Sequence, residues 1–63
     1  MIPVVFVNYA RGEETFTTEM PQVPIVEQTI HFDDENIAAA RVFNVSWCYQ
    51  KSTQSWHAEV AVR

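Results

Sequence analysis

Alternation of apolar and polar residues is clearest near the C-terminal end, where it predicts two half-buried strands over residues 43–50 and 56–63. If residues 51–54 connect these strands, one register gathers every large apolar side chain on one face. Its apolar pairs are Tyr49 with Trp56, Trp47 with Ala58, Val45 with Val60, and Phe43 with Val62. We therefore expect Trp47, Tyr49 and Trp56 to be core residues, with an exposed aromatic binding face as the alternative.

The N-terminal part of the chain predicts a hairpin. Residues 2–10 are rich in β-branched and aromatic side chains, with apolar residues on both alternation faces. This is typical of a strand covered on both sides, either central in a sheet or at a subunit interface. Gly12 accepts a positive φ, so Arg11-Gly12 is expected to turn the chain into a second strand over residues 15–20.

The middle of the chain is less regular. Pro21 and Pro24 cannot donate to a strand ladder, so residues 20–25 are expected to be an extended crossing segment. Residues 29–32 resume the alternation with Ile30 and Phe32 inward. Asp33 and Asp34 can then cap a short helix near residues 34–40, with an irregular loop as the alternative. The fold class that follows is mainly β: a small antiparallel sheet or a partly open SH3-like barrel of four or five strands.

Composition limits the size and the setting of this fold. The chain has 63 residues, 48% of them hydrophobic, which predicts a single domain over residues 1–63 with a folded core. Stability is expected to be marginal at this size, and Cys48, the only cysteine, excludes a disulfide within the chain. A lone cysteine and the lack of a signal-peptide pattern in residues 1–10 indicate a cytoplasmic protein. No apolar stretch approaches the roughly 18–20 residues that span a bilayer.

Charge is distributed unevenly along the chain. The net charge is −4, and seven of the eight acidic residues lie between residues 13 and 35, a stretch without Lys or Arg. Four Lys and Arg residues in the whole chain do not provide a phosphate-binding face, so direct nucleic-acid binding is disfavoured. An acidic face would instead suit a basic protein surface. The candidate protein-binding residues are Glu13, Glu14, Glu19, Asp33, Asp34 and Glu35.

Chemistry-bearing residues are few. The predicted register places Cys48 opposite His57 and Ser46 opposite Glu59, and a thiol beside an imidazole can be a nucleophile or begin a zinc site. A structural zinc needs four ligands, and the other candidates, His31 and Glu59, lack the usual spacings. The chain has no nucleophile elbow and no Gly-rich phosphate loop. We therefore assign no catalytic, cofactor-binding or metal residues and expect no cofactor and no enzyme.

The run MPQVPIVEQTIHF over residues 20–32, followed by VFNVSW over residues 42–47, resembles small phage and prophage accessory proteins. In those proteins a proline-bounded turn leads into a strand, and a second strand ending near a Trp returns beside it in an SH3-like barrel. The resemblance spans about half of the chain. Glu27-Gln28 replaces the Gly-Asp pair often found at that turn. The resemblance implies a non-enzymatic accessory or inhibitory role through protein contacts, and no functional residue carries over.

The sequence thus predicts a small non-enzymatic protein-binding module. In one form it is a phage-encoded inhibitor or accessory protein, whose acidic face binds a basic surface of a host protein. The first alternative is a structural homo-oligomer or virion component, in which excess aromatic surface is buried between copies. The second is a weak binder of single-stranded nucleic acid on an aromatic face.

Overall fold

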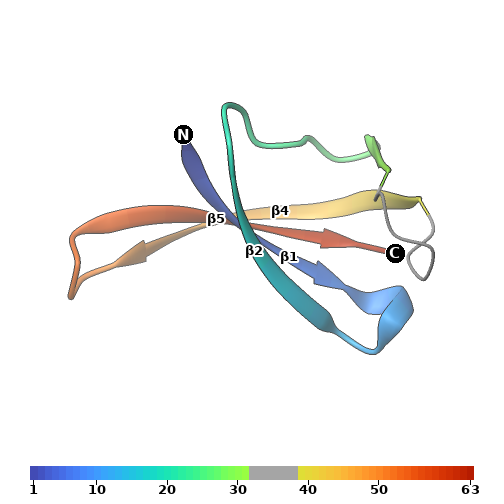
Figure 1. The fold of residues 1–63 in the computed structure, drawn as a ribbon, viewed down its shortest axis with the longest axis horizontal. Helices are drawn as coiled ribbons and strands as arrows, with labels where there is room; N and C mark the ends of the chain where they lie inside the picture. The colour runs from blue at the N-terminus through green and yellow to red at the C-terminus, as the bar shows by residue number, and fades with distance from the viewer. Residues whose placement is uncertain (32–38) are drawn as a thin grey trace.

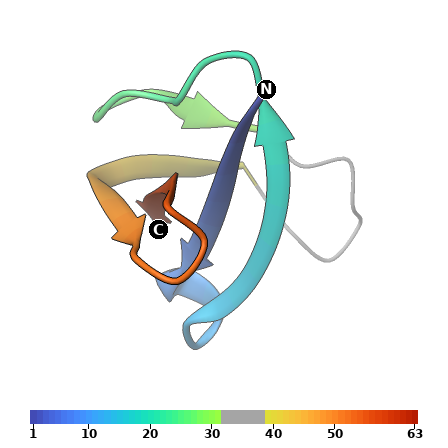
Figure 2. The same cartoon turned by 90° about the vertical axis from the view of Figure 1, so that its left-hand side faces the viewer.

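The computed structural model describes residues 1–31 and 39–63, which form five strands in one curled, mixed sheet (Figure 1). The order across the sheet is β2-β1-β5-β4-β3, and the curl makes a half-barrel (Figure 2). This confirms the mainly β fold class. The strands are β1 (Ile2–Asn8), β2 (Glu14–Met20), β3 (Thr29–Ile30), β4 (Ala40–Gln50) and β5 (Ser55–Val62).

The predicted N-terminal hairpin is confirmed, with β1 antiparallel to β2. Its turn begins earlier than expected, because Tyr9–Arg11 forms a short 3-10 helix, η1, and β1 ends at Asn8. The buried Asn8 side chain accepts a hydrogen bond from the backbone N–H of Ala10 at 3.0 Å, which stabilises this turn. Gly12 follows with a φ of 68°, a left-handed conformation that suits glycine.

Strand β5 lies between β1 and β4 and is parallel to β1. The sequence pattern predicted antiparallel strands, and the other three pairings of the described strands are antiparallel. Parallel pairing requires a long connection, which here consists of β2, β3 and β4 together. Within it, residues 21–28 lead from β2 to β3 without forming a strand, as the prolines predicted. Because β1 pairs with β2 on one side and with β5 on the other, it is a central strand and not an edge strand.

The predicted register of β4 and β5 is confirmed for residues 44–50 against residues 55–61, and it is wrong at Phe43. A bulge between Val42 and Asn44 makes Val42, not Phe43, the partner of Val62. Val42 thereby enters the core, fully buried, and Phe43 turns to the opposite face. There its ring meets Tyr9 edge-on, with centroids 5.5 Å apart, and the Arg63 guanidinium 4.5 Å from its centroid.

The core lies on one face of the sheet, here called the inner face. Ile2, Met20, Val23, Ile30 and Val45 are partly buried against it. The alternate positions of the same strands form the outer face, where Val5 and Val7 are only half-buried. Among the described residues, β1 is central in the sheet, as one of the two alternatives predicted, and its inner face is the more deeply buried one. The buried core side chains are Val4, Phe6, Ala40, Val42, Ala58, Val60 and Val62.

The short helix predicted near residues 34–40 falls largely outside the described residues, and Ala40 belongs to β4. Phe32, predicted to point inward, also lies outside them. The strand predicted over residues 29–32 is present at Thr29–Ile30, with Ile30 packed against the core.

We predict that Val60→Ala lowers the free energy of unfolding by about 2 kcal/mol, since it removes buried methyl groups and leaves a cavity. Val60 is fully buried in β5. Val26→Ala makes the same chemical change at a side chain that is 46% exposed, and should cost less than about 0.5 kcal/mol. Urea unfolding followed by circular dichroism measures both. Equal losses would show that β5 is not the centre of the core.

Candidate functional site

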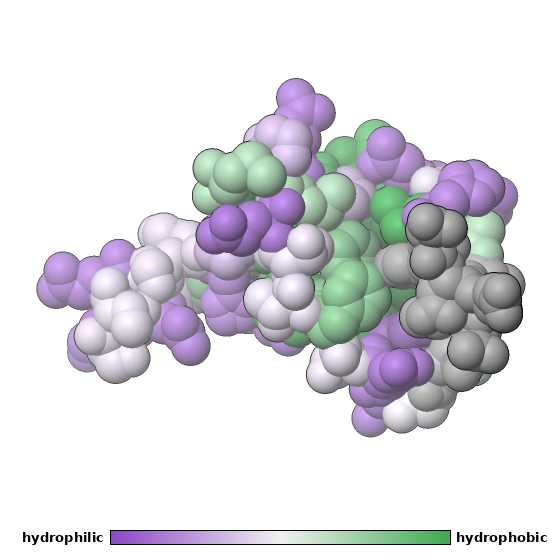
Figure 3. Space-filling model, viewed as in Figure 1, coloured by the Kyte–Doolittle hydropathy of each residue, from purple (hydrophilic) through white to green (hydrophobic). Residues whose placement is uncertain are grey.

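The β4–β5 hairpin projects beyond the body of the sheet, at the left of Figures 1 and 3. We call residues 46–57 the arm. Trp47, Tyr49 and Trp56 lie on its inner face and are 52%, 49% and 58% exposed. Tyr49 and Trp56 pair across the strands with ring centroids 5.0 Å apart. The prediction that these three side chains belong to the core is wrong, because the other strands do not extend far enough to cover the arm.

One edge of β4 is left unpaired along the arm, within the described part of the chain. On the side of β4 away from β5, the partners among the described residues are β3 and the backbone of residues 27 and 28. These reach only Ala40, Arg41 and Val42. Beyond Val42, that edge of β4 has no strand partner in the described part of the chain. Its backbone N–H and C=O groups are therefore available for another strand.

Cys48 and His57 lie on the outer face of the arm, and Glu59 follows on the same face just beyond its base; we call these three residues the Cys-His-Glu cluster. Cys48 and His57 are opposite each other, and Glu59 lies two residues along β5, on the same face. Their candidate ligand atoms all lie within 4.8 Å of one another. The Cys48 thiol donates a hydrogen bond to Glu59 Oε2 at 2.7 Å. Of the two further ligands considered from sequence, the structure brings in Glu59 and not His31.

The Glu59 carboxylate raises the pKa of the Cys48 thiol, chiefly through this hydrogen bond. Desolvation and the negative charge of Glu59 act in the same direction. A raised pKa favours the protonated thiol, which is less nucleophilic than the thiolate.

The predicted acidic residues do not share one face. Glu13 has a φ of 63° beside Gly12, and Glu14 begins β2 opposite Asn8. Glu19 lies near the other end of β2, opposite Pro3, and its five-residue separation from Glu14 puts the two on opposite faces. All three are exposed. Asp33, Asp34 and Glu35 lie outside the described residues.

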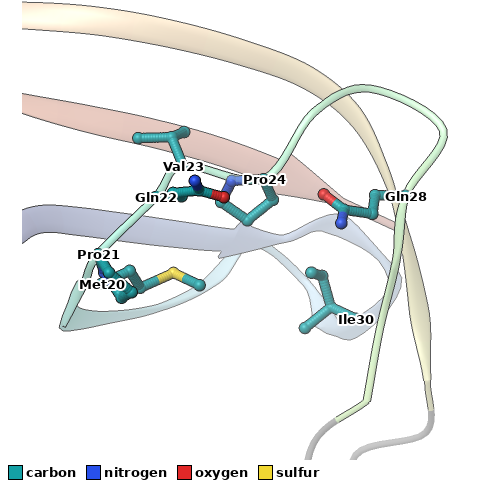
Figure 4. A pocket seen from close by; sticks show the side chains of 7 residues that line it. All are labelled: Met20, Pro21, Gln22, Val23, Pro24, Gln28 and Ile30. Carbon is teal, nitrogen blue, oxygen red and sulfur yellow. The ribbon is translucent and has the colours of Figure 1, made fainter.

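A cavity of about 260 Å³ lies where the end of β2 leads into residues 21–28 (Figure 4). None of its lining residues is ionisable, so it offers no acid, base or charged ligand. Its volume is below the roughly 300–1,000 Å³ usual for small-molecule sites. The lining residues are Met20, Pro21, Gln22, Val23, Pro24, Gln28 and Ile30.

We predict that Glu59→Gln speeds alkylation of Cys48 by iodoacetamide at about pH 8, because loss of the carboxylate charge lowers the thiol pKa. The rate should also reach its plateau at lower pH than in the unaltered protein. Glu27→Gln removes an exposed carboxylate elsewhere and should leave the rate unchanged. A rate profile that Glu59→Gln does not move would contradict the Cys48–Glu59 hydrogen bond.

Comparisons with protein-family models, with curated proteins and with solved structures find no match for this chain. No helix among the described residues is long and apolar enough to cross a membrane.

Proposed function

We propose that the chain is a small non-enzymatic protein-binding module that docks through the arm. The observation that carries this proposal is the exposure of Trp47, Tyr49 and Trp56 on one face of a projecting hairpin. Trp and Tyr contribute binding energy at protein interfaces more often than other residues, because they bury a large area with few rotatable bonds. An accessory or inhibitory role, as the resemblance implies, is one form of this function.

The free edge of β4 favours an extended segment as the bound element. Such a segment can pair with the backbone beyond Val42 and continue the sheet. Its alternate side chains would then meet the aromatic rings on the inner face. Backbone pairing would supply affinity and the rings would supply selectivity, so both observations support the same mode of binding.

Charge favours a basic partner. The net charge is −4, and Glu13, Glu14 and Glu19 are all exposed. Glu14 and Glu19 lie on opposite faces of β2, so these carboxylates do not make a single acidic contact surface. Their combined field would instead attract a basic protein and speed association. In this proposal the arm makes the contact and the acidic residues steer the approach.

We predict that Tyr49→Ala weakens partner binding at least about tenfold, as loss of an interface aromatic does. The partner would be captured with the tagged chain from the cells that produce it, purified, and titrated by calorimetry. Tyr9→Ala is the matched control, since Tyr9 is also 49% exposed and also packs on one aromatic ring. It should change affinity less than about threefold. Equal effects of the two substitutions would place the interface elsewhere.

A second candidate, a homo-oligomer, is favoured by the same edge, because two copies of β4 can pair antiparallel about a two-fold axis.

We predict a monomer by light scattering at all salt concentrations, with partner capture that weakens as salt is added. An oligomer that persists in high salt would instead support the structural role. Quenching of tryptophan fluorescence by oligonucleotides at low salt would support single-strand binding on the arm.

A further inference from the structure

The Cys-His-Glu cluster brings three different metal-ligand types together on the outer face of the sheet, at the base of the arm. Cys48 and His57 occupy paired positions on β4 and β5, and Glu59 is diagonal to Cys48. The antiparallel ladder holds the three backbone positions, so only side-chain rotation is needed to bring the ligand atoms together. This arrangement is independent of the aromatic face, which lies on the other side of the same strands.

The distances suit a small tetrahedral ion. Zinc bonds of about 2.3 Å to sulfur and about 2.0–2.2 Å to nitrogen and oxygen place neighbouring ligand atoms roughly 3.3–3.6 Å apart. Here the separations run from 2.7 Å, between Cys48 Sγ and Glu59 Oε2, up to 4.8 Å at most. Adjustments of about 1 Å, within the reach of side-chain rotation, convert one arrangement into the other.

Charge and access agree with this geometry. A thiolate, a neutral imidazole and a carboxylate together carry −2, which a divalent cation neutralises. The ion would take the place of the proton that Cys48 shares with Glu59, and that proton would leave to solvent. Cys48 and His57 are each only half-buried, so an ion can reach the ligand atoms from solvent.

We propose that Cys48, His57 and Glu59 bind one divalent transition-metal cation, Zn²⁺ by preference, with water as the fourth ligand. Sulfur and imidazole ligands select Zn²⁺ and Co²⁺ over Mg²⁺ and Ca²⁺, which take oxygen ligands. The bound ion links β4 to β5 at the base of the arm. It thereby fixes the strands that present the aromatic side chains on the opposite face.

The test is titration of the reduced, full-length protein with Co²⁺. A thiolate-to-cobalt charge-transfer band should rise in the near ultraviolet and saturate at one ion per chain, and added Zn²⁺ should abolish it. Mg²⁺ and Ca²⁺ should not compete. Cys48→Ser should remove the band, and His57→Gln and Glu59→Gln should each weaken affinity by at least about 10–100-fold.

His31→Gln and Glu27→Gln are the matched controls, because each removes the same side-chain type at an exposed site away from the cluster. Both should bind Co²⁺ like the unaltered protein. Circular dichroism without metal establishes that each variant is folded, and the His57 and Glu59 variants suffice if Cys48→Ser does not fold. The proposal is overturned by absence of the band, by unchanged affinity in both His57→Gln and Glu59→Gln, or by saturation at one ion per two chains.

Discussion

The parallel pairing of β1 with β5 is the interaction on which the rest of this structure depends. It brings Val4 and Phe6 beside Ala58 and Val60, and so joins the N-terminal hairpin to the C-terminal hairpin in one sheet. Without it, each hairpin would leave its apolar face in water, and an isolated two-stranded hairpin is at best marginally stable. The pairing also gives β5 neighbours on both edges, which places Val60 at the centre of the core.

This pairing also limits how far the core extends. The described register of β1 on β5 runs from Ala58 to Val62, so the first residues of β5 and the last residues of β4 lie past the end of that ladder. The strands continue there as a two-stranded arm, whose aromatic side chains on the inner face are about half exposed. Period-two alternation gives the two faces of the hairpin different chemistry: aromatic rings on one and the Cys-His-Glu cluster on the other. The hairpin thus combines a contact surface and a group of ligand atoms in a few residues.

Much of the fold could be predicted from local pattern, and most of the candidate site could not. Alternation located the strands and the register of residues 44–50, because a one-residue slip would reverse the faces of the whole hairpin. It failed at Phe43, where a bulge depends on the space available beside Val42 in the folded core. The cross-strand position of Cys48 and His57 followed from the register. The approach of Glu59 to Cys48 depends on side-chain direction, which sequence spacing does not specify.

By itself, the sequence determined the approximate strand positions, the two hairpins and, apart from Phe43, which side chains of β4 and β5 share a face, because these follow from period-two alternation and from the backbone preferences of Gly and Pro. Only the tertiary structure decided which of those faces are buried. Trp47 and Val60 belong to the same apolar pattern, yet one is 52% exposed and the other is fully buried. The physical reason is that burial requires a covering partner, and the length and pairing of distant strands decide where that cover ends.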